Sequence, residues 1–137
     1  MACSECGADS PIVTAVPDEY REYAPDRADR VAICPRCLTV DRARGGGRDL
    51  DAPDEPDFSR ISDAFPTRTG QAIPLALAIH LCSSLATNRT AIESLLEAVE
   101  REGVDPLLAI DRLRADPTVD PAMDLDRRQH QLEQLLY

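Results

Sequence analysis

The pattern of apolar positions predicts that the second half of the chain is helical. Residues 71–86 carry apolar side chains on nearly every side of a helix, which is typical of a buried central helix or of a dimer seam. Amphipathic stripes predict three more helices, over residues 90–103, 107–115 and 125–136. Because the connections between these helices are short, we expect a small antiparallel bundle.

Capping residues mark the ends of these helices. Pro74 has no backbone N–H, and it therefore fits only in the first turn of the central helix. The second helix is expected to begin at Asn88, or at Thr90 with Glu93 as a capping box. Asp105 precedes a proline and is predicted to cap the third helix.

The first part of the chain has the composition of short β-strands. Runs that contain β-branched residues predict strands over residues 11–16, 30–33 and 38–40. Between the first two strands, Pro17 precedes two acidic residues, which predicts one or two helical turns over residues 17–23. We expect the strands to pair as a small antiparallel sheet.

A segment rich in glycine, proline and acidic residues separates the two parts. Its composition discourages packing and predicts a flexible linker. Directly after it, Phe58, Ile61 and Phe65 are spaced for one face of a short helix, which we expect to close the core of the helical part. The sequence thus predicts an α+β chain with three parts: an N-terminal zinc ribbon (residues 1–44), an acidic linker (45–57) and a helical domain (58–137).

Two Cys-x-x-Cys pairs are expected to form one metal site, with Cys3 and Cys6 in the first pair and Cys34 and Cys37 in the second. Two intervening residues allow a tight turn to aim both sulfurs at one point, and two such turns form a tetrahedral cage of thiolates. We therefore predict one Zn²⁺, with iron as the alternative metal. Two disulfides, or free thiols in the core, are the other interpretation of these cysteines. Four protein ligands leave no open position, so the metal is expected to be structural, and so small a ribbon is expected to need it in order to fold.

The composition adds information on the environment. The 137 residues include 15 Arg, no Lys and 25 acidic residues, which gives a net charge of −10. This composition is similar to that of proteins from salt-loving archaea, in which salt screens the repulsion between carboxylates, although a GC-rich genome would also favour Arg over Lys. We find no apolar run long enough for a membrane span and no signal peptide. We therefore expect a cytoplasmic, reducing location, which favours metal over disulfides.

Three other places in the chain carry side chains suited to binding or catalysis. Asp126, His130 and Glu133 share one face of the last helix, but we interpret that face as solvated because no second ligand-rich helix accompanies it. Cys82 lies in the most apolar segment and is interpreted as a small buried residue. Arg68 lies just before the central helix, where ordinary capping is favoured over the binding of an anion.

The cysteine pairs and their flanking strands resemble the zinc-ribbon superfamily. From the ribbon through residues 56–61 and 105–108 to residues 126–133, the whole chain resembles a family of small uncharacterised haloarchaeal zinc-ribbon proteins. That resemblance implies a habitat and a layout of ribbon plus helices, but no activity. The pairs also resemble those of rubredoxin, which implies redox-active iron. Leu38 departs from the rubredoxin pattern, which has a glycine whose missing Cβ lets backbone N–H groups reach the sulfurs.

These observations favour a non-enzymatic regulatory or interaction adaptor whose ribbon presents a surface to a protein partner. An iron electron carrier and a ribbon that binds nucleic acid are the alternatives. Contacts to an anion or to nucleic acid would come from Arg36, Arg42, Arg44 and Arg68, although the sequence shows no basic stripe. A homodimer through residues 71–86 is a further expectation.

Overall fold

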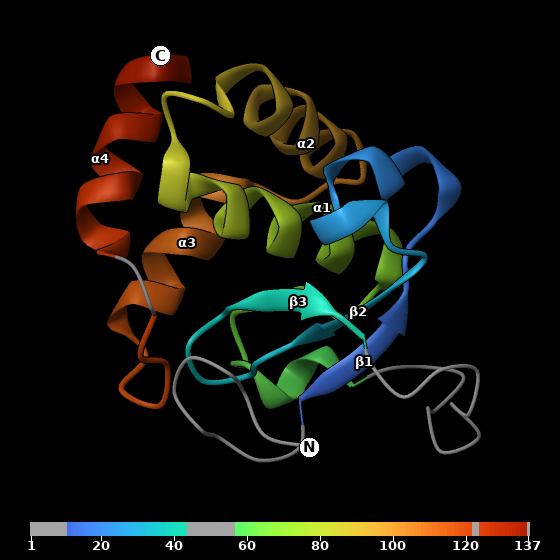
Figure 1. Cartoon of the computed structure of the whole chain (residues 1–137). Coiled ribbons are helices and arrows are strands. Elements are labelled where there is room, and N and C mark those ends of the chain that lie inside the picture. The colour runs from blue at the N-terminus through green and yellow to red at the C-terminus, as the bar shows by residue number, and fades with distance from the viewer. Residues whose placement is uncertain (1–10, 44–56, 122–123, 137) are drawn as a thin grey trace.

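The structure, a computed structural model, describes residues 11–43, 57–121 and 124–136, with side chains as far as residue 134. Within these ranges the chain forms a three-stranded sheet, four α-helices and several 3₁₀ turns (Figure 1). The α+β class is therefore confirmed.

Three antiparallel strands form one sheet, in the order β1 (Ile12–Ala15), β2 (Arg30–Ile33) and β3 (Val40–Arg42). The register places Ile12 opposite Ile33 and Ile33 opposite Val40, so that three branched apolar side chains form a row across the sheet. All three are buried, and the row supplies the apolar face of the sheet. The helical turns predicted after β1 are present as the 3₁₀ helix η1 (Asp18–Tyr23).

The third strand begins later than the pattern predicts. The sequence favours a strand over residues 38–40, but β3 starts only at Val40. Leu38 has a φ angle of 64°, which lies in the left-handed region and is incompatible with an extended strand. The backbone therefore turns at Leu38, and pairing with β2 resumes after the turn.

The four α-helices are α1 (Thr69–Leu81), α2 (Arg89–Arg101), α3 (Pro106–Ala115) and α4 (Leu125–Leu136). Helix α1 lies between α2 and the sheet, and α3 and α4 pack beside each other (Figure 1). Every side chain over residues 72–79 is buried, which confirms the prediction of a central helix. This burial accounts for the apolar composition of α1 within a single chain, and the homodimer stays a prediction.

Helix α1 differs from its prediction at both ends. It begins at Thr69, so Pro74 lies in its second turn and not in its first. It ends at Leu81, earlier than predicted, and the 3₁₀ turn η5 (Cys82–Ser84) follows. The side-chain amide of Asn88 donates to the carbonyl of Leu81 at 3.2 Å. The Asn88 side chain therefore provides a hydrogen-bond donor for the last carbonyl of α1. Asn88 precedes α2 as its N-cap residue, but its side chain makes no cap hydrogen bond to that helix.

The beginnings of α2 and α3 test the predicted caps. Thr90 lies inside the first turn of α2, and Glu93 accepts from Arg89 at 3.4 Å, so the predicted capping box is wrong. Asp105 accepts a hydrogen bond from the backbone N–H of Leu108 at 3.1 Å. The predicted cap of α3 is therefore confirmed.

The segment before α1 is less helical than its periodicity predicts. It forms only the 3₁₀ turn η4 (Phe58–Arg60), which is capped by the carboxylate of Asp57. Phe58, Ile61 and Phe65 are nevertheless all buried, and the two aromatic rings lie 6.4 Å apart. The spacing therefore predicted correctly which side chains enter the core, but not the extent of the helix.

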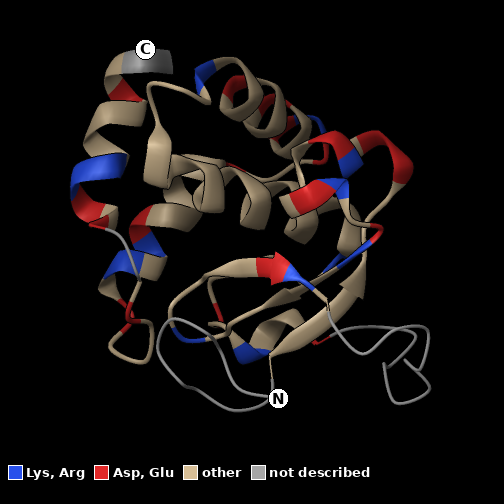
Figure 2. Ribbon diagram, in the orientation of Figure 1, with Lys and Arg blue, Asp and Glu red and all other residues tan. Residues whose placement is uncertain are grey.

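Sheet and helices share one hydrophobic core. Buried side chains from all three strands belong to the same cluster as those of α1, α2, α3 and α4. Helix α1 carries no charged residue, and the charges lie on the surrounding turns and helices (Figure 2). The predicted linker and the domain boundaries fall mostly outside the described residues and stay predictions. Among the described helices, none is long and apolar enough to cross a membrane.

Candidate metal centre

Residues 34–39, here called the knuckle, form a compact turn between β2 and β3. The backbone N–H of Cys34 donates to the carbonyl of Thr39 at 2.9 Å. The backbone N–H of Leu38 donates back to the carbonyl of Cys34 at 3.1 Å. These two bonds join the ends of the turn, and they fix the backbone between the two cysteines.

Both cysteine side chains of the knuckle are buried, with 2% of each residue exposed. The backbone N–H of Cys37 donates to Sγ of Cys34 at 3.5 Å. Sγ of Cys37 donates to the hydroxyl oxygen of Thr39 at 3.1 Å. Donors aimed at a sulfur stabilise its thiolate form, which is the form that binds a metal. The backbone hydrogen bond to Cys34 is therefore suited to a metal-bound thiolate.

Leu38 occupies the position at which the rubredoxin pattern has a glycine. Its positive φ is the conformation that glycine adopts at no steric cost, whereas a leucine there is strained by about 1–2 kcal/mol. Burial of the Leu38 side chain, which is 4% exposed, stabilises the fold by about 1.5–3 kcal/mol. The burial therefore offsets the strain, and the turn keeps its glycine-like backbone without a glycine.

A loop from the helical half of the chain holds the knuckle in place. The backbone N–H of Asp120, between α3 and α4, donates to the carbonyl of Arg36 at 2.7 Å. Asp116 organises this loop by accepting hydrogen bonds from the N–H and the hydroxyl of Thr118, at 2.9 and 2.7 Å. Hydrogen bonds from Ser62 and from Thr118 lower the pKa of the Asp116 carboxyl. The knuckle is thus attached to the helices by backbone as well as by core packing.

Of the four predicted ligands, the structure describes Cys34 and Cys37, whereas Cys3 and Cys6 lie outside the described residues. Within the described part of the chain, no three His, Cys, Asp or Glu side chains gather where they could hold a metal ion. The four-cysteine site and its metal therefore stay a prediction. Two buried sulfurs, one of which accepts a backbone hydrogen bond, on a turn with a left-handed residue, fit one half of a four-thiolate site.

The polar face of α4 carries the three residues weighed as a second metal site: Asp126, His130 and Glu133. Asp126 forms an ion pair with Arg114, and His130 lies 3.4 Å from the amide nitrogen of Gln134. Glu133 accepts a hydrogen bond from the amide of Gln129 at 3.4 Å. Each residue therefore interacts with a partner outside the trio, in agreement with the expectation of a solvated face.

Cys82 and His80 lie near the end of α1. Cys82 is 1% exposed, and burial raises the pKa of its thiol to about 12. It is therefore a buried neutral thiol, as the sequence predicted. Burial also lowers the pKa of His80, against a smaller opposing effect of the Asp41 carboxylate. Cys82 is therefore no thiolate nucleophile at neutral pH, and burial favours the neutral imidazole of His80.

The arginines proposed as anion contacts do not lie on one element. Arg36 is exposed in the knuckle, Arg42 is exposed at the end of β3, and Arg68 is exposed before α1. Arg44 lies outside the described residues. Acidic and basic segments alternate over the described surface, and Asp41 directly precedes Arg42 (Figure 2). This distribution gives little support to a nucleic-acid interface.

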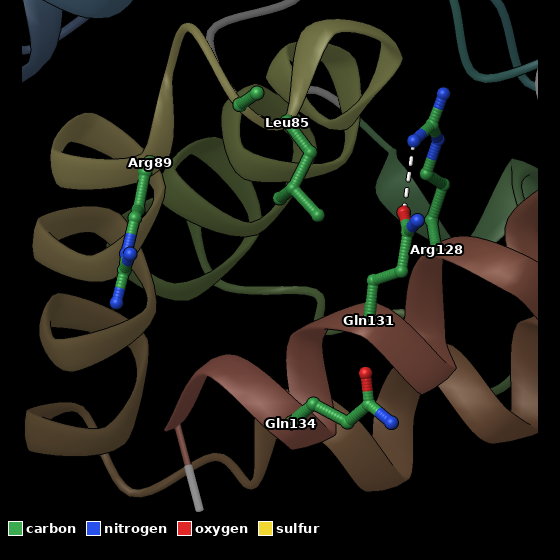
Figure 3. A pocket seen from close by; sticks show the side chains of 6 residues that line it. Leu85, Arg89, Arg128, Gln131 and Gln134 are labelled. Carbon is green, nitrogen blue, oxygen red and sulfur yellow. Dashed lines mark hydrogen bonds between the residues drawn. The ribbon is translucent and has the colours of Figure 1, made fainter.

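An open pocket of about 460 Å³ lies between α4 and the beginning of α2, lined by Leu85, Ala86, Arg89, Arg128, Gln131 and Gln134 (Figure 3). Arg128 donates to the side-chain oxygen of Gln131 at 2.8 Å, and Arg89 pairs with Glu93. The two guanidinium groups lie on opposite sides of the pocket (Figure 3). No short sequence motif predicts this pocket, because its lining residues come from segments far apart in the sequence.

The chain belongs to the Family of unknown function (DUF6276), whose sequence model matches residues 2–136. The match extends from the first cysteine pair to the last helix, and it confirms the expected membership of an uncharacterised family. A comparison with curated proteins and with solved structures found no match. The zinc ribbon and the salt-loving origin stay predictions.

Proposed function

We propose that the protein is a non-enzymatic zinc protein in which Cys3, Cys6, Cys34 and Cys37 hold one structural Zn²⁺. The observation that carries this proposal is the knuckle. Its two buried sulfurs, the N–H···S bond between Cys37 and Cys34, and the left-handed residue that follows fit a metal-binding turn. Cys3 and Cys6 enter the proposal through their matching spacing in the sequence.

A metal with four thiolate ligands has no position open for water or substrate, so its role is to stabilise structure. Among the described residues, Cys82 is a buried neutral thiol and supplies no thiolate nucleophile at neutral pH. The proposed role is therefore that of a regulatory or interaction adaptor for a protein partner. We place it in the reducing cytoplasm of a salt-rich cell, where its charge of −10 favours solubility.

Elemental analysis of the protein purified in its native salt tests the metal. We expect one equivalent of zinc and a colourless protein. A red protein that contains iron and bleaches on reduction would support the electron-carrier alternative instead. Cobalt substitution should add intense thiolate-to-cobalt charge-transfer bands, because sulfur ligands produce them.

Single serine variants identify the ligands. Cys34→Ser and Cys37→Ser should lose most of the bound zinc, and Cys3→Ser and Cys6→Ser should do the same. Cys82→Ser is the matched control, because Cys82 is a buried thiol remote from the knuckle in sequence, and this variant should keep its zinc. Full retention of zinc by Cys34→Ser would contradict the proposed site.

The adaptor role has its own test. In a pull-down in native salt, a protein partner that depends on the zinc-bound surface should be retained by the wild type and by Cys82→Ser. The same partner should be lost with Cys34→Ser. Binding to DNA and RNA should be titrated with salt, because phosphate contacts weaken steeply as salt rises. Retention of nucleic acid at low salt with loss at high salt would favour the nucleic-acid alternative over a protein partner.

A further inference from the structure

We infer that the hydroxyl of Thr39 donates a hydrogen bond to the sulfur of Cys37 when the site holds its metal, and that this bond raises the affinity for zinc. The inference rests on the proposed function, because it concerns the same four-cysteine site. It assigns a positioning and tuning role to a residue that the cysteine spacing alone does not identify.

The geometry of the knuckle places Thr39 for this role. Its hydroxyl oxygen lies 3.1 Å from Sγ of Cys37, and both groups are at least partly buried. The carbonyl of Thr39 accepts from the backbone N–H of Cys34 at 2.9 Å, so the residue that carries the hydroxyl is fixed at the exit of the turn. The next residue, Val40, begins β3 and pairs with Ile33. The backbone that carries the Thr39 hydroxyl is therefore fixed by a hydrogen bond at residue 39 and by strand pairing at residue 40.

The direction of the hydrogen bond depends on the state of the sulfur. A neutral Cys37 thiol donates its proton to the Thr39 oxygen, and the structure has the hydrogen bond in this direction. A metal-bound thiolate has no proton, so the contact persists only when the hydroxyl turns and becomes the donor. Donation to a negatively charged acceptor is a strong hydrogen bond, and the partly buried site limits competition from water.

The two sulfurs of the knuckle then have corresponding donors. Cys34 receives the backbone N–H of Cys37, which every residue type except proline would supply at that position. With the metal bound, Cys37 receives the side-chain hydroxyl of Thr39, which in the structure lies 3.1 Å from its Sγ and depends on the identity of residue 39. Groups that hydrogen-bond to metal ligands change metal affinity by about 10–100-fold when they are removed. We therefore expect the loss of the Thr39 hydroxyl to lie at the lower end of this range, because only one of four thiolates is affected.

A packing role is the competing explanation, since a β-branched residue suits the entry to a strand. Thr39→Val keeps the branch and removes only the hydroxyl, whereas Thr39→Ser keeps the hydroxyl and removes the methyl group. Thr14→Val is the matched control. Thr14 is a buried threonine of β1, 5% exposed, and its hydroxyl donates to the carbonyl of Ala15 at 3.2 Å.

The experiment measures zinc affinity of the full chain by competition with a chromophoric chelator in native salt. Thr39→Val should bind zinc about tenfold more weakly than the wild type, while Thr39→Ser and Thr14→Val stay within about twofold. In the cobalt-substituted proteins, the sulfur-to-cobalt charge-transfer band of Thr39→Val should move to longer wavelength, because a sulfur without its donor gives up electron density more easily. The band of Thr39→Ser should stay in place.

Each other result has a defined meaning. Equal affinity and equal spectra for Thr39→Val and the wild type would overturn the inference and leave the zinc site intact. Equal losses in Thr39→Val and Thr39→Ser, or in Thr39→Val and Thr14→Val, would overturn it in favour of packing. A wild type that binds no metal would overturn the proposed function and this inference together. Thr39→Ala should show the same loss, and it replaces Thr39→Val if that variant does not fold.

Discussion

Replacing Leu38 by alanine and by glycine separates two opposing contributions of this residue to stability. The side chain is 4% exposed and belongs to the common core, whereas the backbone has a φ of 64°. Leu38→Ala removes the buried side chain but keeps the Cβ that strains the backbone. Leu38→Gly removes both. The difference between the two variants therefore reports the strain.

The magnitudes decide the order of stability. Truncation of a buried leucine to alanine costs about 2–5 kcal/mol. Going from alanine to glycine then relieves about 1–2 kcal/mol of left-handed strain and loses about 0.5–1 kcal/mol through the greater freedom of the unfolded chain. We expect both variants to be less stable than the wild type. Leu38→Gly should nevertheless be more stable than Leu38→Ala by about 0.5–1 kcal/mol.

Val31 provides the matched control. It is 1% exposed in β2 and pairs with Arg42, so its side chain is as well buried as that of Leu38 while its backbone is extended. At an extended position glycine is less stable than alanine by about 0.5–1 kcal/mol. The alanine-to-glycine step should therefore have opposite signs at the two sites.

Urea unfolding followed by far-UV circular dichroism measures these differences. All variants should be compared at one salt concentration and with zinc in the same excess, because a ligand bound only to the folded state adds to its apparent stability. The slope of the free energy against urea should stay constant across the variants. Lower stability for Leu38→Gly than for Leu38→Ala would refute the argument that residue 38 is strained.

Three further predictions concern the hydrogen bond from Asp120 to the knuckle and two side chains near the end of α1. Asp120→Pro, which removes the N–H donated to Arg36, should lower the free energy of unfolding by about 1 kcal/mol or more relative to Asp120→Ala, as measured by urea unfolding. Cys82 should resist alkylation at pH 8 in the folded protein, as measured by mass spectrometry, because its thiol is buried with a pKa of about 12; rapid labelling without unfolding would contradict this. The folded-state pKa of His80 is below 6.5, so the unfolded state gains the proton more readily as the pH falls. Its contribution to stability is therefore present at pH 7.5 and lost as the pH falls through 6.5, and His80→Gln should weaken the pH dependence of unfolding between about pH 7.5 and 5.5.

The sequence predicted the elements whose pattern is local. The bounds of β2 and α4 agree with the prediction, because an apolar run or an amphipathic stripe needs no information from distant residues. The buried residues Phe58, Ile61 and Phe65 also followed from their spacing. Burial was easier to predict than conformation, because the apolar character of a side chain persists whether its backbone is an α-helix or a 3₁₀ turn.

Errors arose where a contact between distant residues determines the local structure. Asn88 lies at the start of α2, as one of the two predicted alternatives had it, but its side chain binds the last carbonyl of α1, seven positions earlier, and makes no cap hydrogen bond to α2. Leu38 was placed in a strand because the β-branched residues Thr39 and Val40 follow it, yet it is held in a left-handed turn. Nothing in the residue type predicts this conformation, which survives because the core buries the side chain.

For the candidate site, spacing identified the cysteines but not their surroundings. The role of Thr39 depends on a turn that returns its hydroxyl toward Cys37. The bond from Asp120 to Arg36 joins the knuckle to a loop of the helical half, and no short motif encodes such a contact. Sequence patterns therefore locate metal ligands more readily than the groups that orient them.

The shared core changes what the metal is expected to do. A ribbon of isolated strands would depend on zinc for its fold, as its small size suggests. In this chain, however, Ile33 and Val40 are buried in the same cluster as the side chains of α1, so helix packing also stabilises the strands. The knuckle contributes Leu38 to that cluster, but its two buried cysteines are the proposed metal ligands. We therefore expect zinc to order the knuckle and the loop that binds it, and the helices to hold the sheet.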